Sequence, residues 1–419
     1  MREGPRDRET RYIPSVRQLV RQNLRFFVCA TLAALALRTF FLIKFPHVTS
    51  DSYFYGDLAK NWLLRGIYGL TGEGTRIVPT FARLPGYPAF LALIFAIAGI
   101  DHYGAALLVQ VLVDVGTCFL VADLARRCVS ERAAKAAFLL AASCPFLAQY
   151  SAAALSETLE IFFTALAMDY AVIGLDNLNI AGMRPWAVCG ACVAACTLLR
   201  PDGGLLLAGI GVYLGIVLLR RWRSGATAWP LVRAGIVVAV CALAPLTLWG
   251  VRNWHTLNRF ELLAPRYATE VDEFVPFGFT RWIRTWIADY TSTEEIDWNV
   301  PGETVDPNNL PARAFDTAAQ REATFALFDQ YNQVRRMTPD LDAQFGALAQ
   351  ERIRSHPVRY YVGLPLMRIA DMWLRPRTEL LPPDSRWYDF TDDTQWVVLA
   401  VGFGVLKEEN CSRPYCSVR

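Results

Sequence analysis

Histidine is scarce in this chain: four of its 419 residues are histidine. No group of histidine, cysteine and acidic residues has the spacing of a metal site. We therefore predict that no metal is required, although a divalent ion stays possible where acidic residues come together. The chain also has no visible internal repeat and no low-complexity segment, so a repeat architecture is not indicated.

Ten cysteines are present, but they do not form the framework of a disulfide-rich secreted domain. Cys189, Cys192 and Cys196 follow one another at i, i+3 and i+7 in an apolar stretch, CGACVAACT, and so share one helix face. A CxxC pair is compatible with redox or metal chemistry, but small residues inside a membrane helix more often pack against neighbouring helices. We interpret the three cysteines as packing residues.

Charge is also low for a soluble protein, with 19% charged beside 53% apolar residues. Several apolar runs approach the roughly 20 residues that cross a bilayer, which predicts an all-α polytopic membrane protein. Residues 1–25 contain seven arginines, a pattern also found in nucleic-acid-binding arms and signal peptides. The run that follows, 26–45, is long for a signal peptide, contains Arg38 and lacks a small-residue cleavage site. We interpret it as a retained first span that follows a cytoplasmic N-terminus, and we predict no nucleic-acid partner.

Basic loops and apolar runs together predict a topology in which every inner loop is basic. The seven predicted spans, which form a module over 26–250, are 26–45, 103–125, 133–150, 156–175, 186–199, 204–219 and 231–250. The apolar segment 84–100 is not counted, because crossing there would place the basic loop Arg126–Lys135 outside. We expect it to dip into the membrane or lie along it, within a first outer loop over 46–102.

A second helix is predicted in that loop at 51–65, where Phe54, Leu58 and Trp62 recur at helical spacing. Residues 49–52 offer N-cap candidates, and Gly66 ends the pattern. Such a helix lies in the interface plane of the membrane.

Beyond the spans, 251–390 contains no segment apolar enough to cross and is predicted to be a mainly helical extracytoplasmic region. The last apolar run lies within 391–419 and is short for a span, so we expect a truncated eighth span or a partial insertion followed by a tail.

Charged residues gather at the outer face in this topology. They are Asp51, Arg83, Glu157, Arg200, Asp202 and Arg252. Taken singly, each arginine is explained by snorkelling to the interface, and Asp51 by capping a helix. Together, acids and arginines at one depth fit an anionic lipid-linked ligand.

Sugar transfer from a polyprenyl phosphate fits this arrangement. A base at the outer face would take the proton of an acceptor hydroxyl that attacks the anomeric carbon, and cations would stabilise the departing phosphate. Direct displacement of this kind inverts the anomeric centre. Asp51 is the natural base and Arg83 the nearest cation along the chain; no cofactor is needed.

Several motifs over residues 20–255 resemble a known group. They are TSDSYFYGDLAKNWLLRGIYG, FARLPGYPAFLAL, ALSETLEIFF, TLLRPDGGLLL and the Arg-Asn pair that closes the last span. The chain resembles the bacterial C-type glycosyltransferases that include protein O-mannosyltransferases, aminoarabinose transferases and galacturonosyltransferases of the lipopolysaccharide core. The resemblance implies a seven-span module with juxtamembrane helices in the first outer loop. It also implies a catalytic aspartate at Asp51, a donor-phosphate contact at Arg83 and an acidic position at Glu157.

The predicted site follows from the topology and the resemblance together. Asp51 is assigned as the catalytic base, Arg83, Arg200 and Arg252 as donor-phosphate ligands, and Glu157, Tyr55, Tyr87 and Asp202 as supporting residues. Two departures stand out: Asp51-Ser52 replaces the Asp-Glu pair of many relatives, and Pro85-Gly86-Tyr87-Pro88 replaces the Pro-Pro of the aminoarabinose branch. The second departure argues against that sugar.

We therefore predict an inverting hexosyl- or pentosyltransferase of the cytoplasmic membrane, facing outward, with a lipid, glycan or protein acceptor. A transporter or flippase of a lipid-linked or anionic solute is an alternative. It predicts repeated halves and charges in mid-membrane, whereas the charges here lie at span ends, apart from Arg38, for which the sequence suggests no partner. A truncated, non-catalytic relative is a third hypothesis.

Overall fold

The computed structural model describes residues 16–72, 76–176, 178, 182–264, 274–289 and 292–374. The chain divides into two units, whose described residues are 16–264 and 274–374. The expectation of an eighth span within 391–419 and the first part of the basic N-terminus lie outside the described residues.

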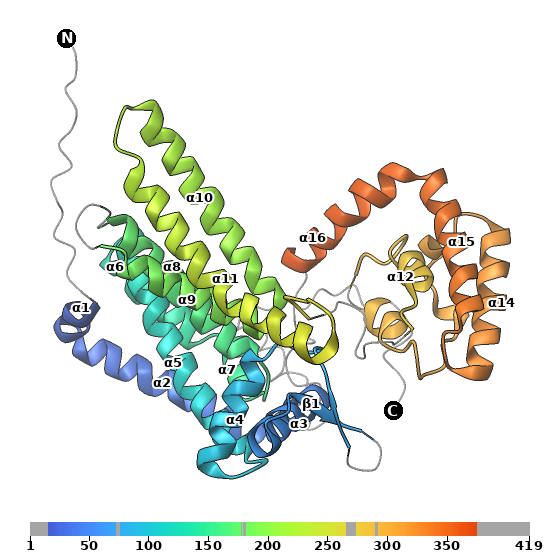
Figure 1. Cartoon of the computed structure of the whole chain (residues 1–419), viewed down its shortest axis with the longest axis horizontal. Helices are drawn as coiled ribbons and strands as arrows, with labels where there is room; N and C mark the ends of the chain where they lie inside the picture. Colours follow the sequence, from blue (N-terminus) through green and yellow to red (C-terminus); the bar gives the residue numbers. More distant parts are fainter. Residues whose placement is uncertain are drawn as a thin grey trace, which may run out of the picture. The chain divides into compact units, whose positions relative to one another are not determined.

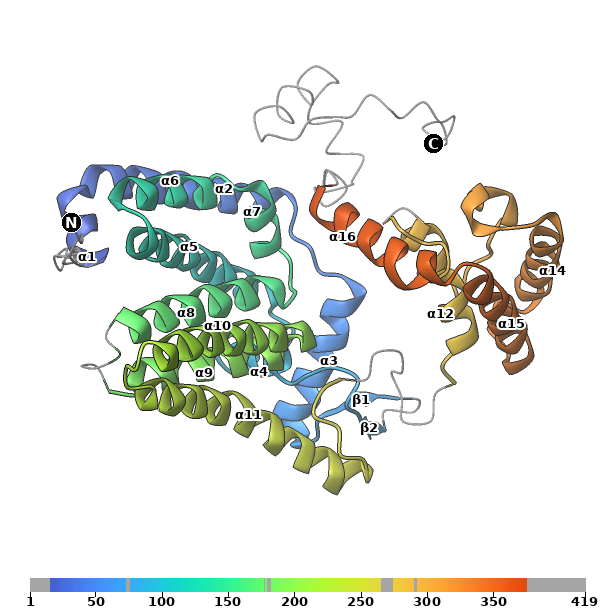
Figure 2. The ribbon, with the colours of Figure 1, turned by 90° about the horizontal axis from the view of Figure 1, so that it is seen from above.

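Helices make up almost all of the first unit (Figure 1). In chain order its elements are α1 (Val16–Gln22), α2 (Leu24–Lys44), α3 (Ser50–Arg65), β1 (Gly69–Thr71), β2 (Ile77–Pro79), α4 (Gly86–Ala98), α5 (Tyr103–Cys128), α6 (Glu131–Ala142), α7 (Pro145–Ser151), α8 (Glu157–Asp176), α9 (Arg184–Leu199), the 3₁₀ turn η2 (Pro201–Gly203), α10 (Gly204–Arg223) and α11 (Trp229–Leu257). The long helices run side by side, and α3 and the β1–β2 hairpin lie at one end of them (Figure 2).

The described residues contain five helices long and apolar enough to cross a membrane: α2, α5, α8, α10 with its preceding turn, and α11. This confirms the prediction of an all-α polytopic membrane protein. Helix α4 has 13 residues and is too short to span, which agrees with leaving 84–100 out of the predicted spans. Helix α9, predicted as a span, has 16 residues.

The predicted span 133–150 is not one continuous helix, because the structure places two helices there, α6 and α7, with a break at Ser143 and Cys144. Pro145 has no N–H, so it cannot donate to the carbonyl of Ala141 as a continuing helix would require. The guanidinium of Arg38, on α2, donates to that carbonyl at 3.1 Å and to the carbonyl of Ala142 at 2.7 Å. An arginine from another helix therefore satisfies the backbone that the proline leaves open.

Arg38 also has the ionic partner that the sequence did not suggest. Its Nε lies 2.5 Å from Oδ2 of Asp114, which is on α5, and its side chain is fully buried. The expectation that charges lie at span ends excepted only Arg38, so Asp114 is a second charge inside a span and was missed from the sequence. The cysteine interpretation is consistent with the structure, since Cys189, Cys192 and Cys196 are all buried.

Helix α3 begins and ends as the sequence predicted. The Thr49 hydroxyl accepts the N–H of Ser52, and the Ser52 hydroxyl accepts the N–H of Thr49, which forms a capping box. The helix ends at Gly66, whose φ of +69° is a left-handed conformation that favours glycine. Leu58, in the middle of the predicted apolar stripe, is fully buried.

The hairpin that follows α3 was not predicted. Its two strands pair antiparallel with Leu70 opposite Val78. The Asp57 carboxylate accepts the N–H of Thr71 at 2.6 Å and its hydroxyl at 2.8 Å, so the hairpin is fastened to α3. The returning strand then carries the chain back towards Arg83.

The second unit is also helical. Its elements are α12 (Phe277–Ile283), the π-helix η3 (Thr293–Asp297), the 3₁₀ turns η4 (Pro307–Asn309) and η5 (Ala312–Ala314), α14 (Ala318–Val334), α15 (Pro339–Ser355), the π-helix η6 (Arg359–Gly363) and α16 (Leu364–Leu374). Its core is aromatic, with Phe279, Trp282, Phe328 and Phe345 buried against one another.

Candidate active site

The predicted base and the predicted cation form a direct pair. Nη2 of Arg83 donates to Oδ1 of Asp51 at 3.1 Å. Both side chains reach solvent, with 56% of Asp51 and 36% of Arg83 exposed. The guanidinium of Arg83 also lies over the ring of Phe54, 4.9 Å from its centroid, which fixes its plane. The pair is therefore held in place and open on one side.

Local sequence explains why the carboxylate of Asp51 is free for this contact. The capping role is filled by Thr49, two residues earlier, so the side chain of Asp51 is not bound to the backbone of its own helix. The cap and the acid are two residues apart and have separate roles. The interpretation of Asp51 as a simple helix cap is therefore wrong.

A second group of charges surrounds Arg200. Its guanidinium lies 2.8 Å from Oε1 of Glu157, 3.3 Å from Oε2 of Glu160 and 3.2 Å from Oδ1 of Asp202. Burial lowers the pKa of Arg200, but the three carboxylates outweigh it and leave the pKa above its usual value. Arg200 is therefore already neutralised by acids, and its role as a phosphate ligand stays a prediction.

Tyr55, on α3, lies between the two groups. The charges of Arg83, Asp51, Glu157 and Arg200 all act on its phenol. Burial raises the pKa of Tyr55, Arg83 opposes the rise, and the two acids add to it, so the phenol stays protonated at neutral pH. The predicted residues on α3, α8 and the α9–α10 turn thus meet around one side chain.

Tyr87 supports Tyr55 from α4. The two rings meet edge to face with centroids 5.1 Å apart. The hydroxyl of Tyr87 donates to Oε1 of Gln110 at 2.7 Å, and Nε2 of Gln110 donates to the carbonyl of Ala153 at 2.7 Å. This buried chain connects α4 to α5 and to the segment before α8, so it fixes the depth of both tyrosines.

Arg252, the last predicted cation, holds the hairpin. It donates to the carbonyls of Tyr68 at 2.6 Å and Thr80 at 2.8 Å, and it stacks on Trp249. Tyr68 in turn donates its hydroxyl to the carbonyl of Arg83 at 2.9 Å. Arg252 is therefore linked to the Asp51–Arg83 pair through Tyr68, with much of its hydrogen-bonding capacity used by the backbone.

A mainly apolar cavity of about 520 Å³ opens beside Arg252. It lies between the end of α3, the hairpin, the end of α9 and α11. Its lining residues are Trp62, Gly66, Ile67, Tyr68, Pro79, Pro85, Leu198, Pro245, Leu248, Trp249, Arg252 and Thr256. The size and the apolar lining suit a hydrocarbon chain with an anionic group near the arginine.

The helices that carry the site residues approach one another closely at two glycines. A Cβ at Gly86 would lie 2.6 Å from the carbonyl oxygen of Leu198, so only glycine lets the start of α4 rest on the end of α9. A Cβ at Gly203 would lie 2.5 Å from the backbone of Cys196. The glycines of the PGYP and RPDGG stretches therefore fix the spacing between Arg83 and Arg200.

Three residues of the site were missed from the sequence: Tyr68, Gln110 and Glu160. Glu160 stands three residues after Glu157, so helical spacing was a usable signal. Gln110 is a polar residue inside a predicted span, which is itself an indication of function or packing. Tyr68 belongs to the unpredicted hairpin and carried no comparable signal.

The described residues contain no group of three or more histidine, cysteine and acidic side chains that could hold a metal ion. The three carboxylates around Arg200 face a guanidinium instead. The prediction that no metal is required stays a prediction.

Comparison with models of protein families gives a match over part of the chain. Residues 79–249 match the family model of dolichyl-phosphate-mannose-protein mannosyltransferases. No curated protein matches the chain. The matched range contains Arg83, Glu157, Arg200 and Asp202, whereas Asp51 and Arg252 lie outside it. The match confirms the resemblance to C-type glycosyltransferases and indicates a membrane glycosyltransferase of the mannosyltransferase type.

Proposed function

Starting from a membrane glycosyltransferase of the mannosyltransferase type, we propose that this chain transfers a sugar, with inversion, from a polyprenyl-phosphate donor to an acceptor hydroxyl. The observation that carries the proposal is the Asp51–Arg83 pair, in which a carboxylate freed from capping stands beside a half-exposed arginine. The charges of this pair and of the group around Arg200 both act on the phenol of Tyr55, which supports placing the two groups in one site.

Asp51 acts as the general base. Its carboxylate takes the proton of the acceptor hydroxyl while the hydroxyl oxygen forms a bond to the anomeric carbon. The bond between that carbon and the phosphate oxygen breaks, and its electron pair leaves with the lipid phosphate. Attack from the face opposite the leaving group inverts the anomeric centre.

Arg83 stabilises the departing phosphate. A guanidinium has five N–H donors, and the contacts of Arg83 with Asp51 and the Ala82 carbonyl use only part of them. The remaining donors are available to phosphate oxygens as negative charge develops on them. Because the acceptor hydroxyl and the phosphate oxygen lie on opposite faces of the anomeric carbon, the neighbouring Asp51 and Arg83 would serve the two ends of one in-line displacement.

The cavity beside Arg252 suits the lipid part of the donor. Its apolar walls come from α9, α11 and the end of α3, and it opens near Tyr68, which contacts Arg83. A polyprenyl chain in this cavity would bring its phosphate to the arginines. Arg252 would then fix the cavity wall and meet the phosphate at its edge.

We propose that the site faces outward from the cytoplasmic membrane. The basic loops Arg126–Lys135 and Arg220–Arg223 lie at the opposite end of the helices from α3 and the hairpin (Figure 2). Loops rich in arginine stay in the cytoplasm, so the end that carries Asp51 is the outer one. The acceptor is a lipid, a glycan or a protein at that surface.

The test compares transfer by membranes that contain the protein or its Asp51→Asn variant. Radiolabelled polyprenyl-phosphate sugars and an acceptor extract are supplied, and incorporated label is counted. Loss of the base is expected to lower the rate by about 10²- to 10⁴-fold. Asp101→Asn is the matched control, because Asp101 is an exposed aspartate in the α4–α5 connection, outside the site. Transfer that is undiminished in Asp51→Asn overturns the assignment.

One observation keeps transport as a second candidate. The Arg38–Asp114 pair is a charged pair inside the helices, which a transporter would predict. However, the guanidinium of Arg38 is fully buried and donates to the carbonyls of Ala34, Ala141 and Ala142, as a structural group does. Movement of a fluorescent lipid-linked sugar across vesicles without sugar transfer would favour transport.

A further inference from the structure

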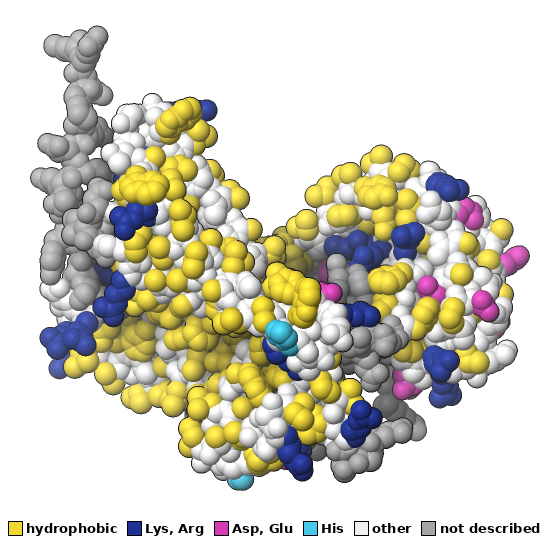
Figure 3. Space-filling view, in the orientation of Figure 1, with side chains coloured by type: hydrophobic (Ala, Val, Ile, Leu, Met, Phe, Trp, Pro, Cys, Tyr) yellow, Lys and Arg dark blue, Asp and Glu magenta, His cyan; other side chains and the backbone are white. Residues whose placement is uncertain are grey.

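The second unit carries an exposed apolar surface along its last two helical segments, η6 and α16. Six of the residues that form it are Val358, Val362, Leu366, Ile369, Trp373 and Leu374, and they are between 51% and 81% exposed. Figure 3 shows hydrophobic side chains gathered where Figure 1 draws α16. We call this surface the α16 face. Exposing a continuous apolar surface to water is unfavourable, and such surfaces usually mark a contact with a membrane or with another molecule.

The polar side of the same helix is turned inward instead. Arg368 donates to the carbonyls of Arg284 at 2.6 Å and Ile287 at 2.9 Å, in the segment after α12. Leu364, one turn earlier on the same side, is buried. Leu366, Ile369 and Trp373 follow one another at i, i+3 and i+7 and lie on the opposite side. The arginine fastens the helix to the unit and the apolar residues point away from it.

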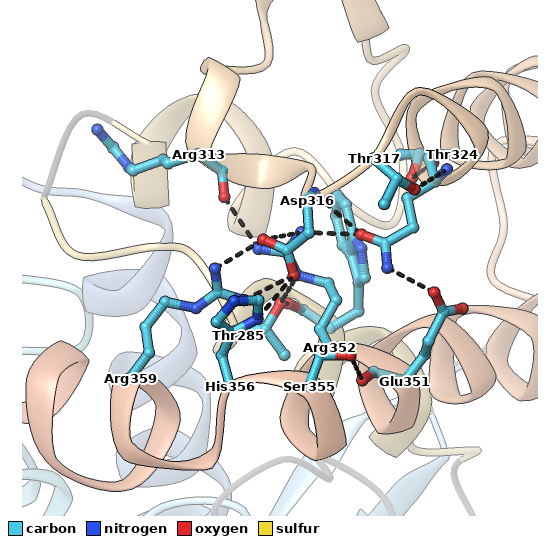
Figure 4. A network of polar contacts seen from close by, with 12 residues as sticks. Thr285, Arg313, Asp316, Thr317, Thr324, Glu351, Arg352, Ser355, His356 and Arg359 are labelled. Carbon is cyan, nitrogen blue, oxygen red and sulfur yellow. Dashed lines mark hydrogen bonds and ion pairs between the residues drawn. The ribbon is translucent and has the colours of Figure 1, made fainter.

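A second arginine fixes the start of this stretch. Arg359 donates to both oxygens of Asp316 at 2.6 and 2.8 Å, and the buried Arg352 lies 3.4 Å from the same carboxylate (Figure 4). The hydrogen bonds from Arg359 lower the pKa of Asp316, so the carboxylate is charged at neutral pH. The orientation of the α16 face is therefore built into the unit by two separate polar attachments.

We propose that the α16 face rests in the surface of an anionic lipid bilayer. The helical stretch η6–α16 covers 16 residues, Arg359 to Leu374, and is about 24 Å long, which is short of the roughly 30 Å of a bilayer core. Its polar side is attached to the unit at both Arg359 and Arg368, so it lies along the membrane. Its exposed Trp373 is the residue type that membrane interfaces favour.

The charge of the segment around α16 and the position of the second unit in the chain both favour an anionic bilayer. Residues 354–377 contain five arginines and one acidic residue, Asp371. Arg359 and Arg368 are bound within the unit, and the other three arginines still outnumber the acidic residue, which fits an anionic headgroup layer. The second unit also follows a membrane-spanning helix closely, since α11 ends at Leu257 and α12 begins at Phe277. A bilayer is thus always within reach, and even a modest affinity for it is sufficient to hold the helix there.

Photocrosslinking of the full chain in nanodiscs tests the proposal. The photoreactive residue p-benzoylphenylalanine replaces Trp373, and the adducts formed on illumination are identified by mass. Discs of phosphatidylglycerol should give lipid adducts at a yield at least about tenfold above that of the same substitution at Trp298, an exposed tryptophan elsewhere in the unit. Pure phosphatidylcholine discs should give several-fold less.

If something other than lipid covers the α16 face, the crosslinked adducts will differ. Crosslinks to another part of the chain, or between two copies of it, would show that protein covers the α16 face and would overturn the proposal. Equal lipid yields at positions 373 and 298, or equal yields in the two kinds of disc, would do the same. The substitution is repeated at Ile369, so that a folding defect at one position does not decide the result.

Discussion

Two arginines of the first unit show how differently a membrane protein uses one side chain. Arg38 is fully buried between α2, α5 and α6, faces Asp114 and donates to three backbone carbonyls. Arg83, at the end of the helices that carries α3, is 36% exposed and pairs with the more exposed Asp51. The first arginine has its hydrogen bonds filled by protein and completes a broken helix. The second keeps N–H donors that a ligand can use. The number of guanidinium donors left without a protein acceptor therefore distinguishes the functional arginine from the structural one.

The largest expected effect is loss of the interior pair. Arg38→Met leaves Asp114 buried without a partner and removes the side-chain donor to the carbonyl of Ala142, so it should lower the free energy of unfolding by about 3–5 kcal/mol. Thermal unfolding in detergent measures it. The matched control is Arg233→Met, an exposed arginine of α11, which should leave stability within about 0.5 kcal/mol.

The double variant Arg38→Met with Asp114→Leu sharpens the comparison. Removing both charges should recover most of the loss, although the carbonyl of Ala142 still lacks its side-chain donor, because an apolar pair costs less than one unpaired charge. A double variant as unstable as Arg38→Met would show that the carbonyl contacts, and not the ion pair, carry the stability.

Removing Arg83 should lower activity and leave stability almost unchanged, in contrast to Arg38. Arg83→Met should lower sugar transfer by about 10²- to 10³-fold, since a donor to the departing phosphate is lost. The unfolding temperature should hardly move, because exposed ion pairs contribute about 0–1 kcal/mol. Arg65→Met, at the exposed end of α3, is the control and should keep activity. A large fall in stability would place Arg83 in the same class as Arg38.

The smallest effect concerns alkaline pH. Burial raises the pKa of Tyr55 and Tyr68 in the folded protein, whereas in the unfolded chain both ionise near pH 10. Their contribution to stability is therefore complete below about pH 10 and is lost as the pH rises beyond it. Unfolding temperatures measured from about pH 8 to about pH 11 should fall more steeply for the natural chain than for Tyr55→Phe with Tyr68→Phe. Parallel curves would contradict this.

The sequence predicted the parts of the fold that depend on local pattern. Apolar runs identified the spanning helices α2, α5, α8, α10 and α11, and helical spacing with a cap and a glycine identified α3. The Asp51–Arg83 pair was also predicted, because family resemblance and topology both placed those residues in one loop. The helices follow from neighbours along the chain, whereas the Asp51–Arg83 pair, 32 residues apart, depended on the resemblance and the topology.

Partners from distant parts of the chain could not be predicted. Asp114 is 76 residues from Arg38, and nothing in either apolar run marks the two as a pair. The hairpin after α3 is held by Asp57, Asn61 and Arg252, through contacts of which the last spans 172 residues. Residue pattern also failed at 133–150, where the apolar run is continuous but the helix is interrupted at Pro145.

Sequence by itself determined that this is a membrane protein of helices, which residue types gather at one end of them, and which acid stands first after the first span. Tertiary structure alone decided that Thr49 and not Asp51 caps α3, that Tyr55 lies among four charges, and that Arg200 is already compensated by acids. The physical reason is that hydrophobicity and helical period act between neighbours, whereas the charge a ligand meets depends on which distant side chains have already satisfied one another.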